Sequence, residues 1–70
     1  MSIDDMMEKA AVKELRVRIV DINGKIYEGI ANHYSKADDE ECGYSSVCID
    51  TDNGEYFGFF ENYIKSIEVI

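Results

Sequence analysis

The chain has 70 residues and a formal net charge of −8 at pH 7. This length allows one domain with a small core, because domains of this size bury only about 60% of the surface of the unfolded chain. Nucleic-acid binding takes most of its affinity from Lys and Arg, so the charge argues against strong binding to DNA or RNA, and also against an anionic membrane surface. Residues 1–34 carry five basic and six acidic side chains, and residues 35–70 carry two and nine.

Residues 2–14 have the pattern of a short helix. Ser2 is a capping residue, and Asp5 three positions later completes a pair that resembles a capping box. A helix this short must pack on something, so we expect it to cover the open end of a barrel; a partner-binding helix and a frayed N-terminus are the alternatives. One apolar stripe would face the barrel: Ile3, Met6, Met7, Ala10 and Ala11.

The first hairpin is expected within residues 15–31. Apolar and charged side chains alternate from Leu15 to Ile19, which is the period of a half-buried strand. The Asn23-Gly24 pair that follows predicts a type I′ turn, in which both central residues have positive φ. Gly29 lies within the returning strand and permits a sharp bend or a close neighbouring backbone.

Apolar Val20 and Ile22, at the end of the first strand, fall on the opposite phase from Val17 and Ile19, which predicts two apolar faces or a bulge there. The second half of the chain predicts three more strands. Asn53-Gly54 marks a second hairpin, and residues 61–63 fit one 3₁₀ turn. We expect strands near 15–22, 25–34, 45–51, 55–60 and 64–70, with Val17, Ile19, Val47, Ile49, Phe57, Phe59, Ile67 and Val69 as the core.

The fold class is therefore mainly β: a short N-terminal α-helix followed by a strongly bent five-stranded antiparallel barrel. Residues 1–14 would form the helix and residues 15–70 the barrel, within a single domain. Four consecutive acids in the connection after the second strand predict a solvated loop, because the spacing of a calcium loop is absent. No metal site is expected, and the weak candidate for one is Asp38, Asp39, Glu40 and Glu41.

Catalysis is not expected. Cys42 and Cys48 do not form a Cys-x-x-Cys pair, and His33 alone cannot complete a convincing zinc site. No Gly-rich phosphate loop is present, and neither cysteine has an identifiable base, so we expect no enzyme and no cofactor. No signal peptide or membrane span is recognisable, so free thiols in the cytoplasm are the expectation. Whether either thiol is reactive stays open.

The order of elements resembles the Sm-like (LSm) family of SH3-like barrels. Gly24-x-x-Tyr27-x-Gly29 is similar to the first Sm motif, and residues 59–64 lie where the second motif would fall. The sequence departs from the family at its RNA site, where it has Lys36-Ala37-Asp38-Asp39 and, before the last strand, Phe60-Glu61. These departures remove the residues that, in the family, would hold a nucleobase of the RNA.

The resemblance implies a non-enzymatic interaction module. It would be a homo-oligomer, as in a ring, joined through strands four and five; another protein is a further partner class, and no membrane is expected. The residues of this interface would be Tyr56, Phe60, Ile64, Ile67, Val69 and Ile70. The alternative is an RNA-binding protein, with RNA contacts at Arg16, Arg18, Tyr34 and Tyr63, although the charge does not favour it.

Overall fold

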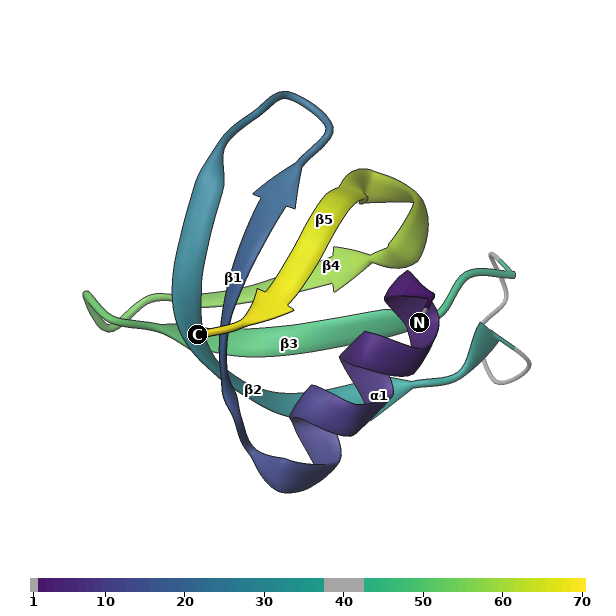
Figure 1. Cartoon of the computed structure of the whole chain (residues 1–70), viewed down its shortest axis with the longest axis horizontal. Helices are drawn as coiled ribbons and strands as arrows, with labels where there is room; N and C mark the ends of the chain where they lie inside the picture. The colour runs from purple at the N-terminus through teal and green to yellow at the C-terminus, as the bar shows by residue number, and fades with distance from the viewer. Residues whose placement is uncertain (1, 38–42) are drawn as a thin grey trace.

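The computed structural model describes residues 2–37 and 43–70, in which a helix packs on one strongly bent antiparallel sheet (Figure 1). The strand order is β4-β3-β2-β1-β5, so β4 and β5 form the two edges. The predicted mainly β, barrel-like fold is confirmed, and the predicted bounds agree within one residue. The elements are α1 (Ile3–Lys13), β1 (Arg16–Asp21), β2 (Ile26–Ser35), β3 (Ser46–Thr51), β4 (Tyr56–Phe60), the 3₁₀ helix η2 (Glu61–Tyr63) and β5 (Ile64–Val69).

The helix α1 begins and ends as its sequence directs. The Ser2 hydroxyl oxygen accepts a hydrogen bond from the Asp5 N–H at 3.1 Å, which satisfies a free donor of the first turn. The helix ends where Glu14 takes a left-handed conformation, with φ of 52°. Its apolar stripe packs against β2, β3 and β5, as expected, and buries Met7 and Ala10. No helix among residues 2–37 and 43–70 is long and apolar enough to cross a membrane.

Both hairpins turn differently from the type I′ prediction, which is wrong. In the first, only Gly24 has a positive φ, of 85°, and its N–H donates to the Asp21 carbonyl oxygen at 2.9 Å. This is a three-residue loop with a left-handed glycine at its end. The Asp21 carboxylate favours it, because Oδ1 accepts from the N–H groups of Asn23 and Lys25, each at 2.9 Å. Gly54, with φ of 86°, ends the second hairpin in the same way.

Gly29 and two irregularities bend the sheet. A Cβ at Gly29 would lie 2.1 Å from the Asp50 carbonyl oxygen of β3, so the predicted close approach is confirmed. The β2–β3 register shifts between Ala31 and His33. The β1–β5 register shifts between Val20 and Asp21, which agrees with the second of the two predicted alternatives, a bulge. These features curl the five strands around the core.

The core agrees with the expectation at five of eight positions. Phe57 and Ile67 are only half-buried, and Val69, with 43% of its surface exposed, does not belong to the core. Val69 faces the same side as buried Val17, but it lies at the end of an edge strand, where little covers it. The buried set is Met7, Ala10, Ala11, Val17, Ile19, Ala31, Val47, Ile49, Phe59 and Ile64.

Candidate functional site

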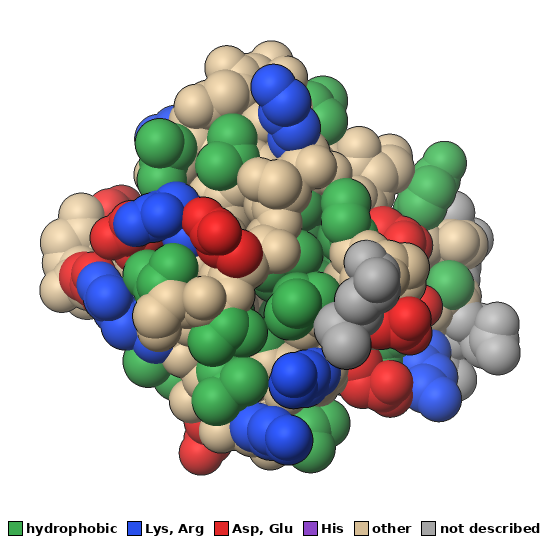
Figure 2. Space-filling model, in the orientation of Figure 1, with side chains coloured by type: hydrophobic (Ala, Val, Ile, Leu, Met, Phe, Trp, Pro, Cys, Tyr) green, Lys and Arg blue, Asp and Glu red, His purple; other side chains and the backbone are tan. Residues whose placement is uncertain are grey.

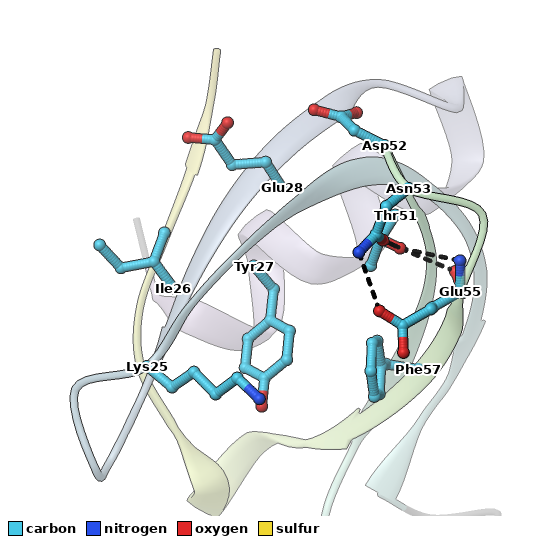
Figure 3. A pocket seen from close by; sticks show the side chains of 9 residues that line it. All are labelled: Lys25, Ile26, Tyr27, Glu28, Thr51, Asp52, Asn53, Glu55 and Phe57. Atoms are coloured by element: carbon cyan, nitrogen blue, oxygen red, sulfur yellow. Dashed lines mark hydrogen bonds between the residues drawn. The ribbon is translucent and has the colours of Figure 1, made fainter.

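A cleft of about 500 Å³ opens between the two hairpins (Figure 3). The bend at Gly29 brings the start of β2 opposite the turn between β3 and β4. Residues from both hairpins therefore face one space, although about 25 positions separate them in the sequence. The lining residues are Lys25, Ile26, Tyr27, Glu28, Thr51, Asp52, Asn53, Glu55 and Phe57.

Aromatic rings form one wall of the cleft. The Tyr27 ring meets Phe57 edge to face, with 5.1 Å between centroids and 62° between planes. It meets the buried Phe59 ring in the same way at 4.9 Å. Rings in this arrangement attract one another beyond their burial, by about 0.5–1.5 kcal/mol a pair. Tyr27 and Phe57 therefore form an apolar wall of the cleft, and the buried Phe59 ring packs against Tyr27.

The charges around these rings are unequal. One cation lines the cleft: the Lys25 amino nitrogen lies 5.2 Å from the centroid of the Tyr27 ring. Three carboxylates line it, those of Glu28, Asp52 and Glu55. Glu55 accepts a hydrogen bond from the Asn53 side-chain amide at 3.0 Å, drawn as a dashed line in Figure 3. Within the part of the chain that the structure describes, Glu55 is in no ion pair, whereas the other two carboxylates pair with arginine.

The two arginines that the RNA alternative needs already have acidic partners. Arg16 pairs with Asp52, and its second contact, to Glu28, is 3.7 Å long. Arg18 pairs with Glu28 at 2.6 Å and with Glu68 at 3.1 Å. The hydrogen bond that Arg16 donates to Asp52 raises the pKa of Arg16, and the one that Arg18 donates to Glu28 raises the pKa of Arg18. On the left of the face drawn in Figure 2, basic and acidic side chains lie in contact.

The two tyrosines of the RNA alternative have different hydrogen-bond partners. Tyr34 is half-buried, and its hydroxyl donates to the Asp4 carboxylate of α1. Burial first, and then this carboxylate, raises the pKa of Tyr34. Tyr63 is more exposed, and its hydroxyl oxygen accepts from the Asn23 amide at 3.1 Å. The structure therefore does not gather the four predicted RNA contacts into one site.

The predicted interface residues are mostly exposed. Tyr56 and Phe60 project from edge strand β4, and Val69 and Ile70 lie at the end of edge strand β5. Ile67 is half-buried against the core. Ile64 is 5% exposed and belongs to the core itself, and it pairs with Asp21 beside the bulge. Ile64 therefore cannot present its side chain to a neighbour.

No metal centre is visible in the described ranges, which contain no group of three His, Cys, Asp or Glu side chains suited to an ion. The weak metal candidate, Asp38 to Glu41, lies outside the described residues, and so does Cys42. Cys48 carries a free thiol and is partly exposed on β3. His33 pairs with it across the strands, and its ring lies 3.4 Å from the Ser35 hydroxyl.

The sequence interpretation missed the cleft, yet a signal for it was present. Each Asn-Gly pair is followed by a charged residue and, two positions later, an aromatic one: Lys25 and Tyr27 in the first hairpin, Glu55 and Phe57 in the second. Residues two apart share one face of a strand. The repeated pattern thus predicts a charged and an aromatic side chain on one face of each hairpin. That both pairs face the same cleft follows only from the bend of the sheet.

Comparison with known proteins corrects the family. No protein-family model and no curated protein sequence matches the chain. The fold is similar to a solved structure, YaeO bound to magnesium from Vibrio cholerae O395, with a TM-score of 0.74 and 17% identity over 94% of this chain and 80% of that one. The predicted resemblance to the Sm-like family is wrong, since the likeness found is to YaeO. The element order that suggested Sm-like proteins is common to several small barrels.

Proposed function

We propose that this protein is a non-enzymatic interaction module that binds a positively charged surface of another protein. The observation that carries the proposal is the cleft between the hairpins, where three carboxylates and one lysine surround an aromatic wall. Aromatic side chains supply binding energy at protein interfaces, and complementary charge supplies speed and specificity of association. The net charge of −8 extends the same preference over the whole molecule.

A protein partner is better supported than RNA. An RNA-binding surface needs cations that are free to contact phosphates. Arg16 and Arg18 each contact two carboxylates, so an RNA strand would have to displace acids that repel it. The Tyr34 hydroxyl is also already hydrogen-bonded to Asp4 of the helix.

Fluorescence anisotropy with two labelled probes tests this proposal. One probe is an arginine- and lysine-rich peptide of mixed sequence, and the other is a single-stranded oligouridine of equal length. We expect the peptide to bind and to weaken as salt rises, and the RNA to give no change. Salt-dependent binding of the RNA, or no binding of the peptide at low salt, would contradict the proposal.

Self-association is a second candidate, favoured by a separate observation. Edges β4 and β5 each have a strand partner on one side only within the described sheet, and both carry exposed apolar side chains. Unpaired strands of this kind are templates for pairing with another chain. Head-to-tail pairing of β4 with the β5 of a second copy would cover both edges, and it closes into a ring if the rotation permits.

A further inference from the structure

The two hairpins repeat a five-residue pattern around the cleft. Residues 23–27 read Asn-Gly-Lys-Ile-Tyr, and residues 53–57 read Asn-Gly-Glu-Tyr-Phe. The two turn glycines, Gly24 and Gly54, have nearly equal φ, 85° and 86°, so the two turns have the same local conformation. The start of β2 thereby brings Lys25 and Tyr27 to the cleft, and the start of β4 brings Glu55 and Phe57.

A cation already occupies the aromatic wall. The Lys25 amino group lies 5.2 Å from the Tyr27 centroid, within the range of a cation–π interaction. Lys25 is exposed and has a long flexible stem, so an incoming cation can displace it at little cost. Its position indicates that the ring face accepts positive charge.

A counter-charge is also available. The Glu55 carboxylate accepts from the neutral amide of Asn53 and is in no ion pair among the residues described. In Figure 3 one of its oxygens points toward Asn53, and the group lies beside the Phe57 ring. A carboxylate beside an aromatic ring fits a guanidinium, which stacks on rings and donates two parallel hydrogen bonds.

We propose that the cleft receives one arginine side chain of the partner protein. Its guanidinium would take the place of the Lys25 amino group at Tyr27 and pair with Glu55, while its aliphatic stem packs on Phe57. Lys25 is then an internal competitor that lowers the affinity of the cleft. This inference rests on the proposed function, since it specifies what the positively charged partner inserts. The cleft volume of about 500 Å³ lies within the range of ligand pockets.

The test is an NMR titration of the ¹⁵N-labelled protein with the peptide acetyl-Gly-Ser-Arg-Ser-Gly-amide. The matched probe contains citrulline, which keeps the shape of arginine without its charge. We expect the arginine peptide alone to shift the amide signals of Lys25, Tyr27, Glu55 and Phe57. Shifts of equal size with citrulline, or shifts centred elsewhere, would overturn the inference.

Two variants with matched controls complete the test. Lys25→Met should tighten arginine-peptide binding about 2- to 5-fold, the equivalent of one exposed cation–π contact, whereas Lys65→Met makes the same charge change on β5 and should tighten it less. Glu55→Gln should weaken binding by at least as much, and Glu61→Gln, at the other end of β4, should not. Equal effects of each variant and its control would refute the arginine site.

Binding of the mixed-sequence basic probe to the same variants separates this inference from the proposed function. If the basic probe of mixed sequence binds in a salt-dependent way and Glu55→Gln weakens it no more than Glu61→Gln does, the acidic surface binds partners without an arginine site. If neither peptide binds, both proposals are wrong. All four substitutions are at sites at least partly exposed, and thermal unfolding of each variant checks that the fold is retained.

Discussion

The hydroxyl of Tyr34, near the end of β2, donates a hydrogen bond to the carboxylate of Asp4 in the first turn of α1. The buried Ser45 hydroxyl lies 3.4 Å from the same tyrosine oxygen and accepts from the Ala37 N–H at 3.0 Å. These hydrogen bonds join the helix to β2 and to the segment that precedes β3. The helix is therefore positioned by hydrogen bonds as well as by burial of its apolar side chains.

Removing the Tyr34 hydroxyl should destabilise the protein. We expect Tyr34→Phe to lower the free energy of unfolding by about 1–2 kcal/mol, because it removes a hydrogen bond to a charged acceptor and leaves the ring in place. Tyr63→Phe is the matched control, since its hydroxyl is exposed, and it should cost less than about 0.5 kcal/mol. Urea unfolding followed by circular dichroism measures both. Equal losses would show that the contact to Asp4 contributes nothing.

The same contact predicts how stability depends on pH. The Tyr34 hydroxyl, and then Ser45, lowers the pKa of Asp4 below 3.8, so this stabilisation is present above that value and is lost as pH falls through the folded pKa. Burial, and then Asp4, raises the pKa of Tyr34 above 10.0, so its stabilisation is complete below that value and is lost as pH rises through the folded pKa.

Melting temperatures measured from acidic to strongly alkaline pH check this prediction. In Tyr34→Phe the alkaline loss due to Tyr34 should disappear, and the acidic loss should become shallower because Asp4 loses its main hydrogen-bond donor. Asp4→Asn should remove the acidic loss due to Asp4 itself. A pH profile of Tyr34→Phe parallel to that of the unsubstituted protein would contradict the assignment.

Two glycines should respond very differently to alanine. At Gly29 a Cβ would lie 2.1 Å from the Asp50 backbone oxygen, so Gly29→Ala must separate β2 from β3 and should cost about 3 kcal/mol or more. At Gly54 no atom lies within 4 Å of an added Cβ, and only the left-handed φ is unfavourable, so Gly54→Ala should cost about 1 kcal/mol. Chemical unfolding of both variants gives the comparison. A Gly54→Ala loss as large as that of Gly29→Ala would show that strand contact is not the cause.

The sequence predicted the features that depend on neighbouring residues. Alternation in β1, the cap at Ser2 and the two Asn-Gly turns are local signals, and the elements that they predict appear within one residue of the expected bounds. The turn type was missed because the Asp21 side chain accepts from two turn N–H groups, which the Asn-Gly rule does not consider.

Features that join distant residues could not be predicted. The partner of Arg16 is Asp52, 36 positions away, and Arg18 reaches Glu68 across 50 positions. These pairs neutralise the two arginines that the RNA alternative needs. The ring contacts of Tyr27 with Phe57 and Phe59 join β2 to β4 and depend likewise on the bend at Gly29.

The last prediction concerns the two sheet edges. The Glu61 N–H donates to the Ser45 carbonyl oxygen, and the Ile70 N–H to that of Arg16. Hydrogen-bonded pairs alternate along an antiparallel ladder, so the N–H groups of Phe60 and Val69 point away from β3 and β1 toward the open edges. A second copy could pair with these groups, and exposed Phe60 would lie in the contact.

Substitution at both edges should therefore block self-association without unfolding the chain. In the double variant, Phe60→Lys places a charge in the apolar contact between the two copies. Val69→Pro removes an N–H that makes no hydrogen bond to β1 of the same chain and that would pair with the second copy. Light scattering should give the unsubstituted protein a mass above the 8.0 kDa of one chain, and the variant the mass of a monomer. Val12→Lys is the control, because Val12 is exposed on α1 and belongs to neither edge strand, and it should leave the oligomer intact. A monomeric unsubstituted protein at high concentration, or a folded double variant that keeps the larger mass, would exclude assembly through β4 and β5.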